Sequence, residues 1–133
     1  MSTFRPSTFL RNVLLADALI SGATGLLLVL GAGLVTEVLG LPVTLLRLTG
    51  LSLLPFASLV AWLATREAPP RAAVWAVIAF NAAWAIDSIL LLLSGWVAPT
   101  ALGLVFTIIQ ASAVLVLAEL QYLGLRRSAP AAA

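Results

Sequence analysis

The sequence predicts an all-α fold, a membrane-spanning four-helix bundle whose helices run up, down, up and down. Of its 133 residues, 62% are hydrophobic and only 9% are charged, whereas a soluble domain carries about 25% charged residues. The mean hydropathy is +1.16, so too little polar surface is present to cover a water-soluble particle. The length allows one domain. We therefore expect the lipid bilayer to be the solvent and the main contact of this chain.

Uncharged runs divide the chain into spans. The longest of them are residues 18–36, 48–65, 72–86 and 88–118. Because one crossing takes about 20 residues, the last run is too long for a single helix, and it contains Gly95 and Pro99, which are typical of a turn. We divide it there. The resulting predicted spans are residues 13–35, 44–64, 72–94 and 101–123.

The connections between these spans are short, about six to eight residues, which favours antiparallel neighbours. The apolar part of the first span exceeds the ~7 to 15 residues of a signal peptide, so we expect it to stay in the membrane. Residues 124–133 are predicted to be a disordered tail.

Arginine placement predicts the orientation. The sequence has seven arginines and no lysine, and six arginines fall on one side of the predicted spans: Arg5, Arg11, Arg66, Arg71, Arg126 and Arg127. Because basic residues are enriched in cytoplasmic loops, both termini are expected in the cytoplasm. Arginine as the only basic residue, together with abundant alanine, suggests a GC-rich bacterium and hence a bacterial inner membrane. No nucleic-acid partner is expected, because the arginines lie at membrane edges and form no groove-facing stripe.

Polar residues inside the spans are the candidate functional site. An ionised side chain at a helix centre costs ~2.5 to 3.5 kcal/mol on insertion scales, so each one needs a partner, water or a neutral form. The candidates are Asp17, Arg47, Asn81, Trp84, Asp87 and Gln110.

Depth suggests partners for these candidates. At ~1.5 Å per residue, Asp17 lies about 6 Å inside the cytoplasmic edge, near the level of Arg11 and Gln121, so Arg11 or water can satisfy it. Asn81 and Gln110 both fall close to the midplane, where an amide pair between helices is expected. A role of this pair along a substrate or proton path is the alternative.

Asp87 and Arg47 form the outer level of the candidate site. They come within reach of each other once the long arginine stem is included. Two interpretations stay open for them, namely a structural ion pair that fixes helix register and a functional polar site. Trp84, at mid-depth, is expected to line the core or a pocket.

Helical phase indicates which faces pack. Asp17, Ser21 and Gly25 lie on one face of the first span with Leu28, which predicts a small-residue seam against a neighbouring helix. In the last span, Glu119 lies opposite the polar stripe and is expected to reach toward the headgroups.

The sequence contains few of the side chains that usually carry out catalysis. Cysteine and histidine are both absent, which removes disulfides, thiol chemistry, the commonest metal ligand and the usual general base. No phosphate-binding loop and no activated serine is visible. We expect no cofactor and no metal, and an enzyme is improbable.

Residues 37–42 (EVLGLP), followed by residues 46–54 (LRLTGLSLL) with Arg47 and Gly50, resemble small bacterial DoxX-like four-helix membrane proteins. The resemblance covers about 20 residues. It implies a compact inner-membrane bundle, some relatives of which accompany redox or stress-response systems, and it transfers no catalytic residue.

Three functions are compatible with these observations. The first is an accessory or interaction subunit that packs against a larger membrane complex or itself. The alternative is a small transporter or channel, proton-coupled and homo-oligomeric, with a water-filled cavity lined by Asp17, Asn81, Asp87 and Gln110. The third is a membrane enzyme acting on lipid or quinone.

Overall fold

The structure, a computed structural model, describes residues 3–130. Its elements are β1 (Phe4–Arg5), α1 (Thr8–Leu30), α2 (Ala32–Leu39), α3 (Val43–Thr65), α4 (Arg71–Ser94), α5 (Ala101–Arg126) and β2 (Ala129–Pro130). The helices α1, α3, α4 and α5 are long and apolar enough to cross a membrane. The predicted all-α four-helix bundle is therefore confirmed, and the four helices indicate a multi-pass membrane protein.

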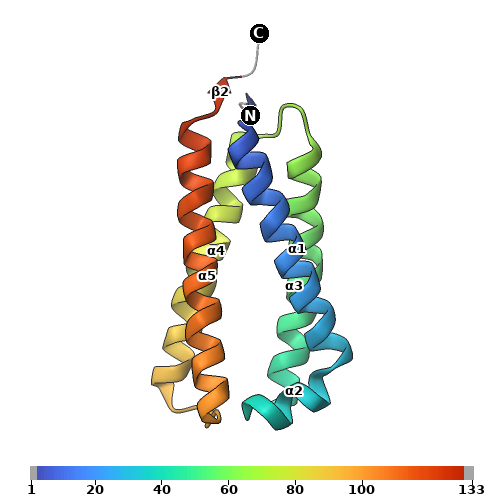
Figure 1. Cartoon of the computed structure of the whole chain (residues 1–133), viewed down its shortest axis with the longest axis vertical. Helices are drawn as coiled ribbons and strands as arrows, with labels where there is room; N and C mark the ends of the chain where they lie inside the picture. The colour runs from blue at the N-terminus through green and yellow to red at the C-terminus, as the bar shows by residue number, and fades with distance from the viewer. Residues whose placement is uncertain (1–2, 131–133) are drawn as a thin grey trace.

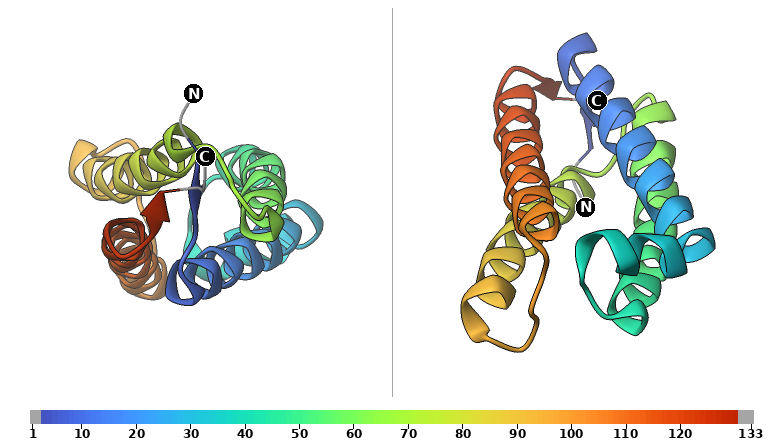
Figure 2. Two further views of the ribbon diagram at one scale, coloured as in Figure 1. Left: turned by 90° about the horizontal axis from the view of Figure 1, so that it is seen from above. Right: turned by 60° about the horizontal axis from the view of Figure 1, so that its bottom comes forward.

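The four long helices form two pairs. Helix α1 packs along α3 and α4 packs along α5. The two pairs meet through α1 and α5, and α3 meets α4 through side chains, such as the stacked rings of Phe56 and Phe80 with centroids 4.2 Å apart. Figure 1 shows the pairs close together at the end that carries both chain ends and spread apart at the opposite end, where α2 lies. The right view of Figure 2, in which the bottom of the bundle comes forward, shows the same separation. We call these two parts the terminal half and the open half.

The α1–α3 pair is held by close backbone contact. A Cβ atom added at Gly50 would lie 2.8 Å from the carbonyl oxygen of Gly25, and one added at Gly25 would lie 3.1 Å from the carbonyl oxygen of Gly50. Only residues without a side chain allow this approach. Asp17, Ser21, Gly25 and Leu28 are all buried on α1, so the predicted seam on this helix is confirmed.

The first predicted span, residues 13–35, differs from the structure at both ends. The Ser7 side chain accepts a hydrogen bond from the Leu10 backbone N–H and caps α1, so the helix begins at Thr8. Serine is a favoured N-cap residue. At the other end, Gly31 ends α1, and the short helix α2 follows until Gly40, which adopts a left-handed φ of 71°.

The tail predicted to be disordered, residues 124–133, is ordered as far as the structure describes it. Helix α5 continues to Arg126, and β2 then pairs antiparallel with β1. The Ser7 backbone N–H donates to Ser128 Oγ at 3.0 Å, and that hydroxyl donates to the Gly124 carbonyl at 2.8 Å. The two chain ends therefore hold each other, a long-range contact that local composition does not reveal. Residues 131–133 lie outside the described residues.

Candidate functional site

Asp17 is the centre of a buried hydrogen-bond network in the terminal half. Its side chain is 1% exposed. Its Oδ2 atom accepts from Asn81 Nδ2 at 2.8 Å and from Gln121 Nε2 at 2.7 Å. Its Oδ1 atom accepts from Ser21 Oγ at 3.0 Å, and Asn81 Nδ2 also donates to Gln121 Oε1 at 3.0 Å. We call these four residues the Asp17 network, and it joins α1, α4 and α5.

No arginine belongs to the Asp17 network. Arg11, the partner expected from depth, instead donates to the backbone carbonyls of Ala64 and Arg66 at the end of α3. The carboxyl group therefore depends on neutral donors alone. Hydrogen bonds in a low-dielectric interior are strong, and an unsatisfied member is costly. Within residues 3–130, every fully buried polar side-chain atom has a partner.

A second network joins α4 to α5 in the open half. Trp84 Nε1 donates to Gln110 Oε1 at 3.2 Å, and Gln110 Nε2 donates to Ser88 Oγ at 2.9 Å and to the Thr107 carbonyl at 3.1 Å. Ser88 Oγ in turn donates to the Trp84 carbonyl at 2.8 Å. We call this the Gln110 network.

The expected amide pair between Asn81 and Gln110 is wrong, because each amide belongs to a different network. The error comes from the start of α1. Since α1 begins at Thr8, Asp17 lies nine residues, or about 14 Å, along its helix. Asn81 lies ten residues from the start of α4, so the two side chains are level and bond to each other.

The expected ion pair between Asp87 and Arg47 is also wrong. No such ion pair exists among the described residues, and both side chains are exposed. Their helices, α3 and α4, meet through Phe56 and Phe80, whereas Arg47 and Asp87 lie toward the other end of the bundle, where the helix pairs are spread apart. The antiparallel chain order makes α3 and α4 neighbours in sequence, whereas the contacts place each of them against a different helix.

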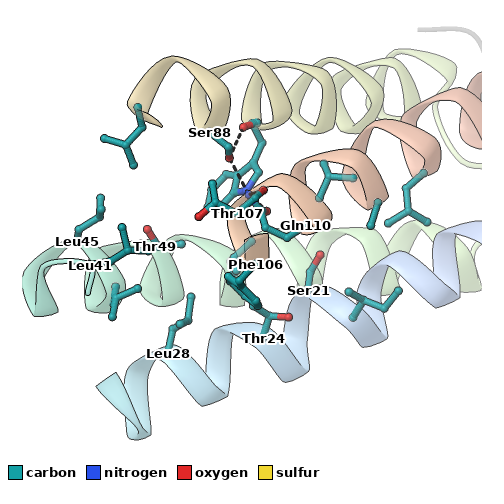
Figure 3. Close-up of a pocket in the computed structure, with 18 residues that line it drawn as sticks. Ser21, Thr24, Leu28, Leu41, Leu45, Thr49, Ser88, Phe106, Thr107 and Gln110 are labelled. Atoms are coloured by element: carbon teal, nitrogen blue, oxygen red, sulfur yellow. Dashed lines mark hydrogen bonds between the residues drawn. The ribbon is translucent and has the colours of Figure 1, made fainter. Parts of the chain in front are cut away.

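A cavity of about 210 Å³ lies in the open half between the two helix pairs. Figure 3 shows Thr24 and Thr49 on the α1–α3 pair and Ser88, Thr107 and Gln110 across from them on the α4–α5 pair. Most of the wall is apolar, and none of the lining residues is charged. The polar lining residues are Ser21, Thr24, Thr49, Trp84, Ser88, Thr107 and Gln110.

Of the six candidate residues, only Trp84 and Gln110 line this cavity. Asp17 and Asn81 lie in the Asp17 network next to it, and Ser21 contacts both regions. The interpretation of Trp84 as a pocket-lining residue is confirmed.

Six participating residues lie outside the candidate set: Ser21, Thr24, Thr49, Ser88, Thr107 and Gln121. Four of them carried a usable signal. Ser21 follows Asp17 by one helical turn, Ser88 follows Trp84 by one turn, and Thr107 and Gln121 lie on the polar stripe of the last span. Thr24 and Thr49 carried none, because an isolated hydroxyl in an apolar helix resembles any other until its neighbours are known.

The arrangement is suited to holding helices together and to hydrogen bonding a neutral group. No cluster of three or more metal-ligating side chains occurs in the described part of the chain. Comparisons with protein-family models, with curated proteins and with solved structures gave no significant match to this chain.

Proposed function

We propose that this protein is an accessory or interaction subunit of a bacterial inner membrane, with both termini in the cytoplasm, and that it acts by associating with a membrane partner. The orientation is supported by six arginines near the terminal half. Several of their guanidinium groups lie over aromatic rings there, such as Arg66 over Trp62 at 5.1 Å and Arg127 over Phe9 at 5.0 Å. Cytoplasmic segments of membrane proteins are rich in arginine and lysine.

The observation that carries the proposal is an exposed acid within a membrane span. Asp87 lies seven residues from the end of α4, about 10 Å along the helix, and it contacts no donor or cation among residues 3–130. A charged side chain facing hydrocarbon is costly and normally finds a partner. Since no partner lies among the described residues, we infer that the partner comes from another molecule.

A second copy of this chain supplies a suitable group. Arg47 is exposed and lies four residues from the start of α3, at the same end of the molecule as Asp87. The flexible side chain of Arg47 can span the difference in depth between Arg47 and Asp87. We therefore assign self-association, with Asp87 of one copy paired to Arg47 of the next.

Glu119 is also exposed, but the same argument does not extend to it. Glu119 lies seven residues from the end of α5, at the end of the bundle opposite to Arg47, so it cannot pair with the Arg47 of a second copy that has the same orientation in the membrane. Glu119 therefore provides a matched control.

The transporter alternative receives less support. It needs acids that line a water-filled cavity, whereas the cavity in the open half is lined by neutral residues and Asp17 is bonded internally. The accessory role is the function that the geometry supports best.

The test is a charge exchange measured by subunit counting in lipid vesicles. We expect wild-type chains to associate, Asp87→Arg to weaken association at least tenfold, and the double variant Asp87→Arg with Arg47→Asp to restore it. Glu119→Arg should leave association unchanged. Monomeric wild-type protein, or a double variant no better than Asp87→Arg, would contradict the proposed pairing.

A further inference from the structure

Four hydroxyl groups form a layer in the cavity of the open half. Thr24 lies six residues before the end of α1, Thr49 six residues after the start of α3, Ser88 six residues before the end of α4 and Thr107 six residues after the start of α5. At 1.5 Å per residue each is about 9 Å along its helix from the same end of the bundle. All four line the cavity.

Two of these hydroxyls have no partner. Ser88 and Thr107 donate to the carbonyl four residues earlier, as Ser52, Ser58 and Ser112 do elsewhere. Thr24 and Thr49 donate to no acceptor in the described chain. Both threonines are part-buried residues that line the cavity, and a hydroxyl in a hydrocarbon environment without an acceptor costs free energy. Both of these hydroxyls face a cavity in which a ligand oxygen would satisfy them.

The wall of the cavity defines the chemistry of that ligand. No charged residue lines it, so it offers no ion pair to a phosphate or an ammonium group. The lining is mostly leucine, isoleucine, valine and phenylalanine. An apolar cavity of ~150 Å³ holds a benzene molecule, so the volume of about 210 Å³ accommodates a ring or a stretch of chain somewhat larger than that.

The geometry points to a binding site for a neutral lipid, a ring or chain that carries an uncharged carbonyl or hydroxyl oxygen. The ligand oxygen accepts from Thr24 or Thr49, and the apolar part fills the space between the helix pairs. Because the two helix pairs spread apart in the open half (Figure 1), a molecule dissolved in the bilayer reaches the cavity from the side. A phospholipid fits less well, because its ester groups belong at the membrane surface and its headgroup is charged. This inference is independent of the pairing of Asp87 with Arg47.

The test uses a long-chain ketone labelled with carbon-13 at its carbonyl, added to vesicles that contain the purified protein. We expect saturable binding of one ketone per chain and an infrared carbonyl band shifted to lower frequency by hydrogen bonding. The double variant Thr24→Val with Thr49→Val keeps the side-chain volume and removes both hydroxyls. It should abolish the shifted band and weaken binding roughly tenfold. Thr44→Val, an exposed change outside the cavity on α3, is the matched control and should match wild type.

A second variant separates binding from folding. Ala113 lines the cavity and is exposed, so Ala113→Phe should fill the cavity without disturbing the core, and it should prevent ketone binding while the protein keeps its helical circular dichroism. The inference is overturned if wild type shows no saturable binding or if the valine variant keeps the shifted band. It is also overturned if phosphatidylcholine with labelled ester carbonyls gives the same saturable shifted band, because a bilayer phospholipid would then be the occupant.

Discussion

The terminal half and the open half of this bundle contain similar polar residues, but their hydrogen bonds cross between the helix pairs only in the terminal half. In the terminal half, the Asp17 network connects α1 of one helix pair with α4 and α5 of the other. In the open half, the Gln110 network stays within the α4–α5 pair. The pairs are close where hydrogen bonds cross between them and apart where the bonds do not.

This difference shows what polar residues contribute in a lipid solvent. Apolar side chains gain little by meeting each other instead of lipid, so helix association relies on packing and on hydrogen bonds between helices. The Asp17 network joins the two pairs at one end, together with an apolar cluster that includes Leu14, Val60 and Val77. The other end keeps a cavity with unpaired hydroxyl groups, and it is therefore the end suited to a ligand.

Removal of Asp17 is expected to have the largest effect on this arrangement. Asp17→Leu leaves Ser21 and the amides of Asn81 and Gln121 with lost acceptors in a buried site. We expect a loss of roughly 2–4 kcal/mol in unfolding free energy, because each unsatisfied buried donor is costly. Steric trapping in bicelles measures this quantity directly.

The matched control is Asp87→Leu, which replaces another intramembrane aspartate that makes no internal bond. At protein dilutions at which chains are monomeric, its unfolding free energy should stay within about 0.5 kcal/mol of wild type. Equal losses for the two variants would show that the Asp17 network does not hold the helix pairs together.

A smaller effect is expected for Gln110→Leu in the open half. It removes the acceptor of Trp84 Nε1 and the donor to Ser88, bonds that lie within one helix pair. We expect a loss of roughly 0.6 to 1.7 kcal/mol, from the mean to the largest value measured for hydrogen bonds between membrane helices. The same unfolding assay applies, and a loss as large as that of Asp17→Leu would remove the distinction between the two halves.

The sequence was sufficient to predict the features that depend on local composition and on helical periodicity. Uncharged runs and a predicted turn near Gly95 and Pro99 located all four long helices, and the phase of Asp17, Ser21 and Gly25 identified the packed face of α1. These features are local, since each follows from residues on one helix. Glu119 is exposed, as its phase indicated.

The partners of the polar residues depend on how helices are arranged, and there the predictions were wrong. An unrecognised cap at Ser7 shifted the start of α1 by five residues relative to the predicted span at Val13, which displaced Asp17 by more than one helical turn. Arg47 and Asp87 failed as a pair because chain order does not determine which helices touch. The cavity and its hydroxyl layer arise only when four helices are brought together.

The most direct test of four membrane crossings with both termini in the cytoplasm is to determine which side of the membrane each end of the bundle occupies. The chain lacks cysteine, so single cysteines can be introduced at exposed positions and labelled in intact cells with a maleimide that does not cross the inner membrane. We predict that Ser94→Cys, at the open end, is labelled from outside, whereas Thr65→Cys and Ala129→Cys, at the terminal end, are labelled only after the membrane is permeabilised. Labelling of Ala129→Cys in intact cells, or of Thr65→Cys and Ala129→Cys from opposite sides, would contradict four crossings with both ends in the cytoplasm.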